Sequence, residues 1–367
     1  MSSPKFISAK RICNVCRLAG NYTSNREVAE HLRAALIKAI AIASITDLFV
    51  NTTIASPPST MSRALLITGA TGKQGGSVID ALVARRSPFI ILALTRDARS
   101  SSAQRLAAKS PTIRLVEGNL DDVPALFSAA RQSAGTTPIW GVYSVQVSMG
   151  KGVTLQGEER QGKALIDESI KAGVKHFVYS SVERGGDARS WDNPTNVPHF
   201  VTKHHIEHYL RDTTADSELG WTILRPAIFM DNLEPGFPGK LFMTTLRDTM
   251  KDKPLQWVAT HDIGAFAAMA FEDPERWNER AIGLAGDCLT FEQLSQTFRN
   301  ATGSPVGTTF GLLGKALKHG VTEVGSMVDF FRDEGYKANM EEVKRMNPQM
   351  MDLDTWLRTK SKFVKRT

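Results

Sequence analysis

Apolar stretches with the length of β-strands alternate with amphipathic stretches from about residue 61 to residue 226. The apolar stretches contain few alternating polar positions, which is typical of strands covered on both faces of a sheet. Such strands alternating with helices predict a doubly wound α/β fold with a parallel sheet. We expect strands at 64–68, 89–95, 112–117, 139–145, 176–180 and 221–224. Helices should fill the gaps, for example at 158–172, where apolar residues share one face.

The pattern becomes irregular and richer in helical stretches after Pro226. We therefore expect a core at about 61–230 and a smaller, substrate-side C-terminal lobe at about 231–367. Large apolar residues of this lobe could line a pocket, although such residues more often fill a core. They are Phe237, Phe242, Met243, Met250 and Trp257.

The first 60 residues differ from this pattern and end in a loop-like stretch rich in Ser and Pro at 55–60. We expect an N-terminal extension, 1–60, that is disordered or processed, ahead of a domain at 61–367. The extension holds seven Lys or Arg against three acids, so more than half of the net charge of +7 lies outside the predicted domain. Because no helix-turn-helix, zinc finger or basic stripe is recognisable, we expect no direct nucleic-acid binding.

The longest apolar run, 34–50, is interrupted by Lys38 and Asp47. It is shorter than the roughly 20 residues that a membrane-spanning helix needs, so we expect no membrane span. Three cysteines cannot form a disulfide framework and fit a reducing compartment. We expect a cytoplasmic protein, with the nucleus as an alternative. Mitochondrial import is less favoured because Glu27 and Glu30 lie in the basic N-terminal segment.

A glycine loop joins the first predicted strand to the first predicted helix. It reads Gly69-Ala70-Thr71-Gly72-Lys73-Gln74-Gly75, with the spacing G-x-x-G-x-x-G. Glycines at this spacing allow a sharp turn, a close approach of the backbone to a pyrophosphate, and close packing of the helix on the sheet. The helix N-terminus then offers free N–H groups to the phosphates. The loop therefore predicts a dinucleotide site in a Rossmann fold.

The residue at the end of the second strand indicates which dinucleotide is bound. NAD-specific proteins place an acid about 20 residues beyond the last motif glycine, where it binds the ribose 2′-hydroxyl. This chain has Thr95-Arg96 there. A guanidinium can pair with a 2′-phosphate, so we expect NADP(H). The next residue, Asp97, leaves open the alternative that Arg96 is a solvated surface charge.

Loops after the third and fourth strands should border the same crevice, because parallel strands end at one edge of the sheet. Asn119 and Leu120 follow the third strand and should lie near the adenine. Val145, Gln146 and Val147 follow the fourth.

Candidate catalytic residues lie in the segment 197–203. Reductases of this fold often use a tyrosine as proton donor, with a lysine four residues later on the same helix. Here His199 occupies the tyrosine position and Lys203 the lysine position. Lys203 could act in acid–base chemistry with His199 as a proton relay, or it could anchor the cofactor while His199 only packs. Ser180 and Ser181 could place a hydroxyl beside a substrate carbonyl or cap a helix.

The sequence offers no convincing metal site. His204 and His208 share a helix face, but no Cys or well-spaced carboxylate completes a ligand set. The single Cys13-x-x-Cys16 pair lies in the N-terminal extension without a second pair, and we consider it incidental.

Taken in order along 62–362, these motifs resemble those of the NmrA-like family, atypical members of the extended short-chain dehydrogenase/reductase superfamily. The matching pieces are 67–78, 94–96, 117–122, 161–167, 178–181, 199–203, 224–233 and 354–357. The resemblance implies that NADP(H) is held by the glycine loop, by Arg96, by the loops at Asn119 and at 145–147, and by Lys203. It also implies contacts over the nicotinamide from Phe229, Met230, Asp231 and Asn232. Arg160 is a looser match, since it replaces the family's usual lysine.

Two functions remain open because the family contains both redox-sensing regulators and reductases that use a lysine without the tyrosine. The favoured expectation is an NADPH-dependent oxidoreductase that reduces a small, apolar carbonyl or unsaturated compound, in keeping with fungal relatives in secondary metabolism. The alternative is a non-catalytic sensor of NADPH and NADP⁺ that regulates transcription through a protein partner. A homodimer stays open as an assembly.

Overall fold

The computed structural model describes residues 63–150 and 152–364. Its main element is a seven-stranded sheet in the order β3-β2-β1-β4-β5-β6-β9, in which all neighbours are parallel. The strands are β1 (Arg63–Ile67), β2 (Phe89–Thr95), β3 (Ile113–Glu117), β4 (Ile139–Ser144), β5 (His176–Ser180), β6 (Gly220–Pro226) and β9 (Arg280–Leu284). The predicted doubly wound α/β fold is confirmed, as are its six expected strands.

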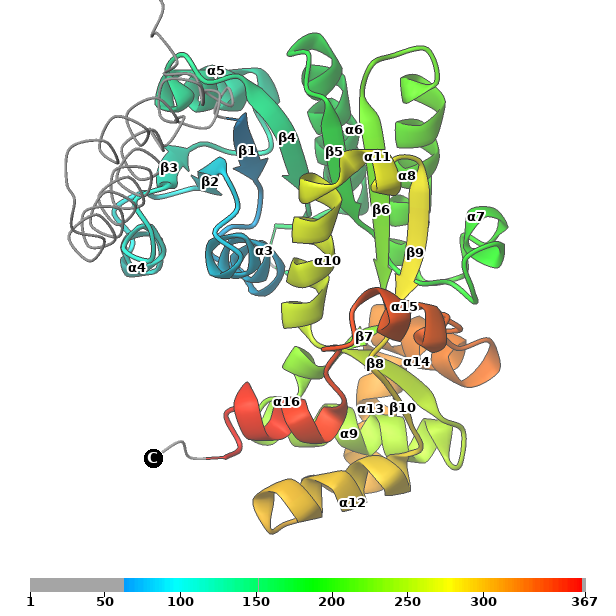
Figure 1. Ribbon diagram of the computed structural model, residues 1–367. Helices are drawn as coiled ribbons and strands as arrows, with labels where there is room; N and C mark the ends of the chain where they lie inside the picture. The colour runs from blue at the N-terminus through cyan, green and yellow to red at the C-terminus, as the bar shows by residue number, and fades with distance from the viewer. Residues whose placement is uncertain (1–62, 151, 365–367) are drawn as a thin grey trace, which may run out of the picture. The chain divides into compact units, whose positions relative to one another are not determined.

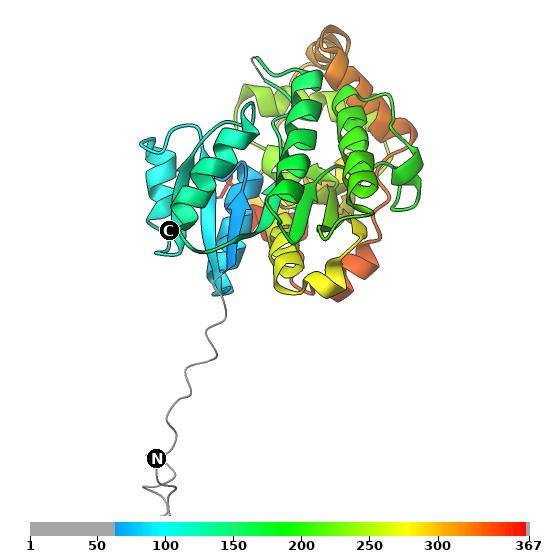
Figure 2. The ribbon, with the colours of Figure 1, turned by 90° about the horizontal axis from the view of Figure 1, so that it is seen from above.

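Helices cover both faces of this sheet because its strands alternate between two apolar cores. In β1, Leu65 and Ile67 belong to the core under α3 (Lys73–Ala84) and α10 (Thr260–Glu272), whereas Ala64 and Leu66 belong to the core under α5 (Val123–Ala134), α6 (Leu155–Lys171) and α8 (Pro198–Thr214). Figure 2 shows α6 and α8 in green on one side of the strands and α10 in yellow on the other. Side chains that alternate along a strand point to opposite faces, so both layers are specified by one short sequence.

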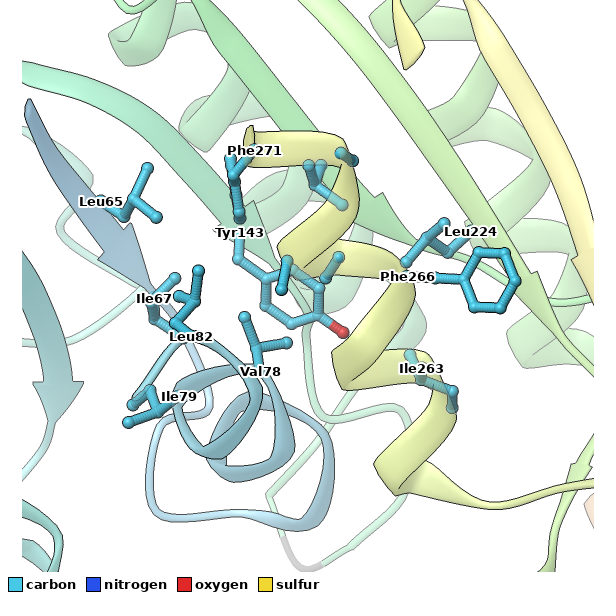
Figure 3. Close-up of a cluster of buried hydrophobic side chains, with 14 of the residues drawn as sticks. Leu65, Ile67, Val78, Ile79, Leu82, Tyr143, Leu224, Ile263, Phe266 and Phe271 are labelled. Carbon is cyan, nitrogen blue, oxygen red and sulfur yellow. The ribbon is translucent and has the colours of Figure 1, made fainter. Parts of the chain in front are cut away.

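The first of these cores is drawn in Figure 3, where Tyr143 of β4 lies among apolar side chains of α3 and α10. Val78 and Leu82 approach from α3, and Ile263 and Phe266 from α10. This packing fixes α3, and with it the glycine loop, against the sheet. Shorter helices complete the periphery: α4 (Ser101–Ala107), α7 (Arg189–Asp192) and α11 (Pro274–Trp277).

A second core lies in the C-terminal part of the chain, beyond the carboxyl ends of the large sheet (Figure 1). It contains the sheet β10-β8-β7, formed by β7 (Ile228–Phe229), β8 (Leu255–Val258) and β10 (Asp287–Leu289). The 3₁₀ turn η1 (Met230–Asn232) follows β7. The surrounding helices are α9 (Phe237–Met250), α12 (Phe291–Thr302), α13 (Gly311–Gly320), α14 (Thr322–Asp333), α15 (Met340–Met346) and α16 (Leu353–Thr359).

The chain returns to the large sheet after it has entered this lobe. α10 packs against α3, and β9 pairs with β6 as the seventh strand. A single division near residue 230 therefore does not separate the two cores. β9 was not predicted because it contains a glycine and lies among irregular segments, outside the regular alternation of strands and helices that ends near residue 226.

No helix within residues 63–150 and 152–364 has the length and apolar character to cross a membrane. The whole predicted extension, 1–60, lies outside the described residues, and with it the apolar run 34–50 and the Cys13/Cys16 pair.

Candidate functional site

The glycine loop lies between β1 and α3, next to the place where strand order reverses between β1 and β4. Gly69 has a φ of +59°, a left-handed conformation that favours glycine, and a Cβ there would lie 2.8 Å from Val145 Cγ1. A Cβ on Gly75 would lie 2.4 Å from the carbonyl oxygen of Thr68. The loop thus takes a path that only glycine allows, as the motif predicts.

The first turn of α3 is arranged to receive an anion. Its N-cap is Gly72, and in the described part of the chain no side chain caps it and no acid lies in its first turn. Backbone N–H groups at such a helix start need an external acceptor, and the helix dipole favours a negative one. A pyrophosphate fits this position.

A cleft of about 690 Å³ extends from the loop across the carboxyl ends of β1, β2, β3 and β4. Nine of the expected cofactor residues line it: Gly69, Thr71, Gly72, Arg96, Asn119, Leu120, Val145, Val147 and Arg160. The remaining lining comes largely from the segment 149–161, including Gly157, Glu158 and Gln161. The cleft has the size of a cofactor site and lies at the topological switch point, where open α/β sheets bind their ligands.

Two guanidinium groups border the cleft. Arg96 lines it, whereas its neighbour Asp97 is used locally, with Oδ1 accepting from the backbone N–H of Arg99 at 2.8 Å. Arg160 Nη2 lies 3.5 Å from Asp121 Oδ1. A hydrogen bond from Gln161 is the main reason why the pKa of Asp121 lies below its usual value. Positive charge therefore remains in the cleft at Arg96.

A second, largely apolar pocket of about 440 Å³ adjoins the cleft, and Met149 lines both. Expected site residues Gln74, Gln146, His199, Lys203, Phe229 and Asn232 line this pocket. Its apolar wall includes Phe200 and Phe242 and is completed by Val324, Met327, Phe331 and Tyr336. Of the five lobe residues expected to offer pocket surface, only Phe242 lines this pocket. Met243, Met250 and Trp257 are buried in the lobe core and Phe237 is exposed.

Lys203 and Glu158 form a buried ion pair at the wall between the two cavities. Lys203 Nζ donates to Glu158 Oε1 at 2.7 Å, and Ser148 Oγ donates to the same oxygen at 2.8 Å. Thr202 Oγ1 lies 2.9 Å from Glu158 Oε2. Burial alone would raise the pKa of Glu158, but the charge of Lys203 and these hydrogen bonds outweigh it, so the pKa lies below its usual value. The carboxylate is therefore ionised and holds the lysine in place.

His199 is held by a carboxylate from the C-terminal lobe. Its Nδ1 and its backbone N–H both contact Glu323 Oε1 of α14, the latter at 3.2 Å. The N-cap of α8, Val197, offers no side-chain acceptor, so Glu323 supplies it from another element. Burial lowers the pKa of His199, although Glu323 opposes the change. Since the carboxylate accepts at Nδ1, Nε2 is the ring atom left for a ligand.

A hydrogen-bonded group at the end of β5 links the glycine loop to the apolar pocket. Ser180 Oγ donates to Gln74 Oε1 at 2.6 Å, and Tyr143 Oη lies 3.5 Å from the same atom. Burial raises the pKa of Tyr143, so its phenol stays protonated. Ser181 lines the pocket. Ser180 itself lines neither cavity and reaches the pocket only through Gln74. The helix-capping alternative is wrong for both serines, since the next helix, α7, begins after Ala188.

Gln146 carries a buried polar atom without a partner. Its Nε2 donates to Ser144 Oγ at 2.9 Å, while its Oε1 has no hydrogen-bond partner among the described residues. A buried unpaired amide oxygen is costly, and in a pocket wall it indicates a ligand donor. This orphaned atom and the glycine cradle together fit a dinucleotide that reaches from the cleft into the pocket.

Four expected cofactor residues point elsewhere. Lys73 Nζ donates to the backbone carbonyl of Asp231 at 2.6 Å and pairs with Glu234. The Asp231 carboxylate accepts from the backbone N–H and the hydroxyl of Thr260. Met230 and Ala70 are buried. Lys73 and Asp231 thus fix the segment that carries Phe229 and Asn232 into the pocket.

His204 and His208, which share a helix face, have a structural partner. His204 Nε2 and His208 Nε2 both lie 2.8 Å from the carbonyl oxygen of Trp191. Within the described ranges no group of three His, Cys, Asp or Glu side chains could hold a metal ion.

Sequence reasoning missed Glu158 and Glu323, the two carboxylates that hold the candidate catalytic residues. Glu158 is 45 residues from Lys203 in the sequence, and Glu323 is 124 residues from His199, so no local spacing connects either pair. The one available signal was an acid on the buried face of an otherwise amphipathic helix.

Known proteins resemble this chain in sequence and in fold. The model of the NmrA-like family matches residues 61–357. The chain is 30% identical over 259 residues to the NmrA-like family domain-containing oxidoreductase hkm9 of Aspergillus hancockii, covering 66% of this chain and 73% of that protein. Among solved structures, NmrA, a negative transcriptional regulator in complex with NADP, has a TM-score of 0.60 at 21% identity, covering 82% of this chain and 95% of that one. The triphenylmethane reductase of Citrobacter sp. complexed with NADP(H) has a TM-score of 0.59 at 19% identity, covering 81% and 99%.

The two structural likenesses show a shared fold, and the family match spans nearly all of the described chain. The expected resemblance is confirmed: the chain belongs to the NmrA-like family.

Proposed function

We propose that this protein is an NADP(H)-dependent oxidoreductase that reduces a small, apolar carbonyl or unsaturated compound. The observation that carries the proposal is the position of Lys203, which lines the apolar pocket while its partner Glu158 lines the adjoining cleft. A donor at this junction can serve a substrate on one side and a cofactor on the other. The oxidoreductase name of a fungal relative and the NADP(H) in the Citrobacter reductase structure support the same reading.

The cleft residues would hold the cofactor in distinct ways. Gly69, Gly72 and the first turn of α3 fit the pyrophosphate, and Arg96 fits the 2′-phosphate. Asn119 and Leu120 border the region expected for the adenine. When bound, NADPH supplies a hydride.

Lys203 would bind and polarise the oxygen of the substrate. Its ammonium donates one hydrogen bond to Glu158 and retains two further N–H donors for a ligand. Because Glu158 is ionised, the proton that reaches the substrate oxygen comes from Lys203 and not from its partner. His199 Nε2, in the same pocket, is placed to relay a replacement proton. Apolar walls exclude water from this step.

The test is turnover with a matched pair of lysine variants. NADPH oxidation is followed across a panel of ketones, quinones and enones for the wild type, K203A and K163A. Lys163 is the control because it pairs with Glu159, and neither residue lines the cleft or the apolar pocket. We expect K203A to lower kcat by about a hundredfold or more and K163A to leave it unchanged. If no panel compound is reduced and K203A alters only NADPH affinity, the enzyme proposal is wrong.

A redox sensor is the second candidate, supported by the likeness to NmrA, a negative transcriptional regulator that was solved with NADP. In that case NADPH and NADP⁺ would bind with different affinities, or would change association with a protein partner or a second copy, without turnover. Calorimetric titration with each nucleotide, with size measured by light scattering, separates the two candidates.

A further inference from the structure

The apolar pocket has an unusual balance of charge at its polar end. Among its described lining residues, Lys203 and His199 are the two that can carry a positive charge, and each already contacts a carboxylate from another element. Glu158 pairs with Lys203, and Glu323 contacts His199. Each positive charge at this end of the pocket is therefore already balanced by a carboxylate, so a bound anion would add an unbalanced negative charge.

The two carboxylates are well placed to dominate this end of the pocket. Glu158 is fully buried, so its charge is poorly screened by water. The side chain of Glu323 is 22% exposed and sits directly behind the imidazole. With His199 neutral the two pairs carry a net negative charge, and with His199 protonated they sum to zero. In neither state does the pocket offer a net positive charge.

The rest of the described pocket lining adds no positive charge that could balance an anion. Its other polar groups are amides and hydroxyls, such as Asn232 and Ser181, and its walls are aromatic and aliphatic. In the cofactor-free protein the unpaired Gln146 Oε1 is a further acceptor, which repels a carboxylate and attracts an N–H or O–H group. Burying an unpaired charge in such surroundings is costly.

We propose that this pocket selects ligands whose polar end is uncharged or cationic and excludes carboxylates, with Glu158 and Glu323 as the residues that set this selectivity. The inference rests on the proposed function only in taking this pocket as the substrate site. Neutral carbonyl compounds, imines and amines have such an uncharged or cationic polar end, whereas oxo acids carry a carboxylate. Glu158 and Glu323 act through Lys203 and His199 and are positioning residues.

The experiment uses three probes that share one naphthyl group and differ only in their head: 2-naphthylmethanol, 2-naphthylmethylammonium and 2-naphthoate. Each is titrated calorimetrically into the full chain, with and without saturating NADPH. None of the probes is an aldehyde, ketone or enone that NADPH could reduce, so binding is read without turnover. We expect 2-naphthoate to bind at least fivefold more weakly than the alcohol, and the ammonium at least as tightly as the alcohol.

Variants assign the selectivity to the two carboxylates. E158Q and E323Q should each raise 2-naphthoate affinity at least fivefold relative to the alcohol. E323Q is the second variant because Glu158 is fully buried, so E158Q could disturb folding as well as ligand binding, whereas Glu323 is partly exposed. E159Q is the control, since Glu159 is adjacent on α6 and contacts Lys163 and His205 outside the pocket.

The proposal is overturned if 2-naphthoate binds within fivefold of the alcohol, if none of the three probes binds, or if E323Q changes 2-naphthoate affinity no more than E159Q does. Failure of the proposed function looks different. In that case NADPH does not bind or is never oxidised, while the ranking of the three probes in cofactor-free protein still stands.

Discussion

Lys203 Nζ donates to Glu158 Oε1 at 2.7 Å, and this pair joins α8 to α6 at the wall shared by the glycine-loop cleft and the apolar pocket. The pair is almost wholly removed from solvent. A buried carboxylate and a buried ammonium each depend on the other, because either one alone would remain charged in a medium of low dielectric.

Removing one partner of the pair should destabilise the protein more than removing both. K203M leaves the Glu158 carboxylate unpaired, and we expect it to lower the free energy of unfolding by about 3 kcal/mol. The double variant E158Q/K203M should recover much of that loss. Urea denaturation of the wild type, the two single variants and the double variant measures this coupling, and additive losses would contradict it.

Gly75 should tolerate no side chain. Its Cβ would lie 2.4 Å from a backbone oxygen, so G75A must move β1 away from α3 and should lower NADPH affinity at least about tenfold. Gly76 is the matched control, because its Cβ would meet its nearest neighbour at 3.4 Å. Fluorescence titration with NADPH compares the two variants, and equal affinities would refute the role of Gly75.

Arg96 should set the preference for the phosphorylated cofactor. A charge-assisted hydrogen bond contributes roughly 1.5–3 kcal/mol, so R96A should reduce the ratio of NADPH to NADH affinity by about tenfold or more. R99A is the control, since the Arg99 side chain is 96% exposed and lies outside the cleft lining. An unchanged ratio in R96A would show that the 2′-phosphate is recognised elsewhere.

His176 should make the fold sensitive to mild acid. Burial between Trp140 and Phe271 lowers its pKa to about 4, whereas the unfolded chain titrates near the ordinary value of about 6.5. Between these values the unfolded state binds a proton that the native state does not. Stability should therefore be complete above pH 6.5 and fall by up to about 1.4 kcal/mol per unit as the pH drops toward 4.

The variant H176Q isolates this contribution. Its free energy of unfolding should depend less on pH between 6.5 and 4 than that of the wild type. H319Q, at an exposed position on α13, should follow the wild type. Denaturant unfolding at several pH values provides the comparison, and parallel curves for H176Q and the wild type would exclude His176 as the source.

Local sequence by itself determined the strands of the large sheet and the glycine loop that borders the cleft. Strands such as β2 and β5 were predicted at their observed bounds, because a strand buried on both faces is a continuous apolar run. The position of the glycine loop was also predicted from local sequence, because the turn at Gly69 and the close contact at Gly75 exclude other residues. The position of Arg96 at the cleft was predicted from its distance along the chain beyond the last glycine of the motif.

Tertiary structure decided what surrounds the candidate chemistry. β9 and α10 return to the large sheet from within the C-terminal half, and no local pattern specifies that path. Lys73, expected at the phosphates, instead holds the segment after β7, because its neighbours there come from distant parts of the chain. Glu158 and Glu323 reach Lys203 and His199 across 45 and 124 residues. Sequence thus determined which groups are present, while the charge they carry and the ligand they face depend on partners that only folding brings together.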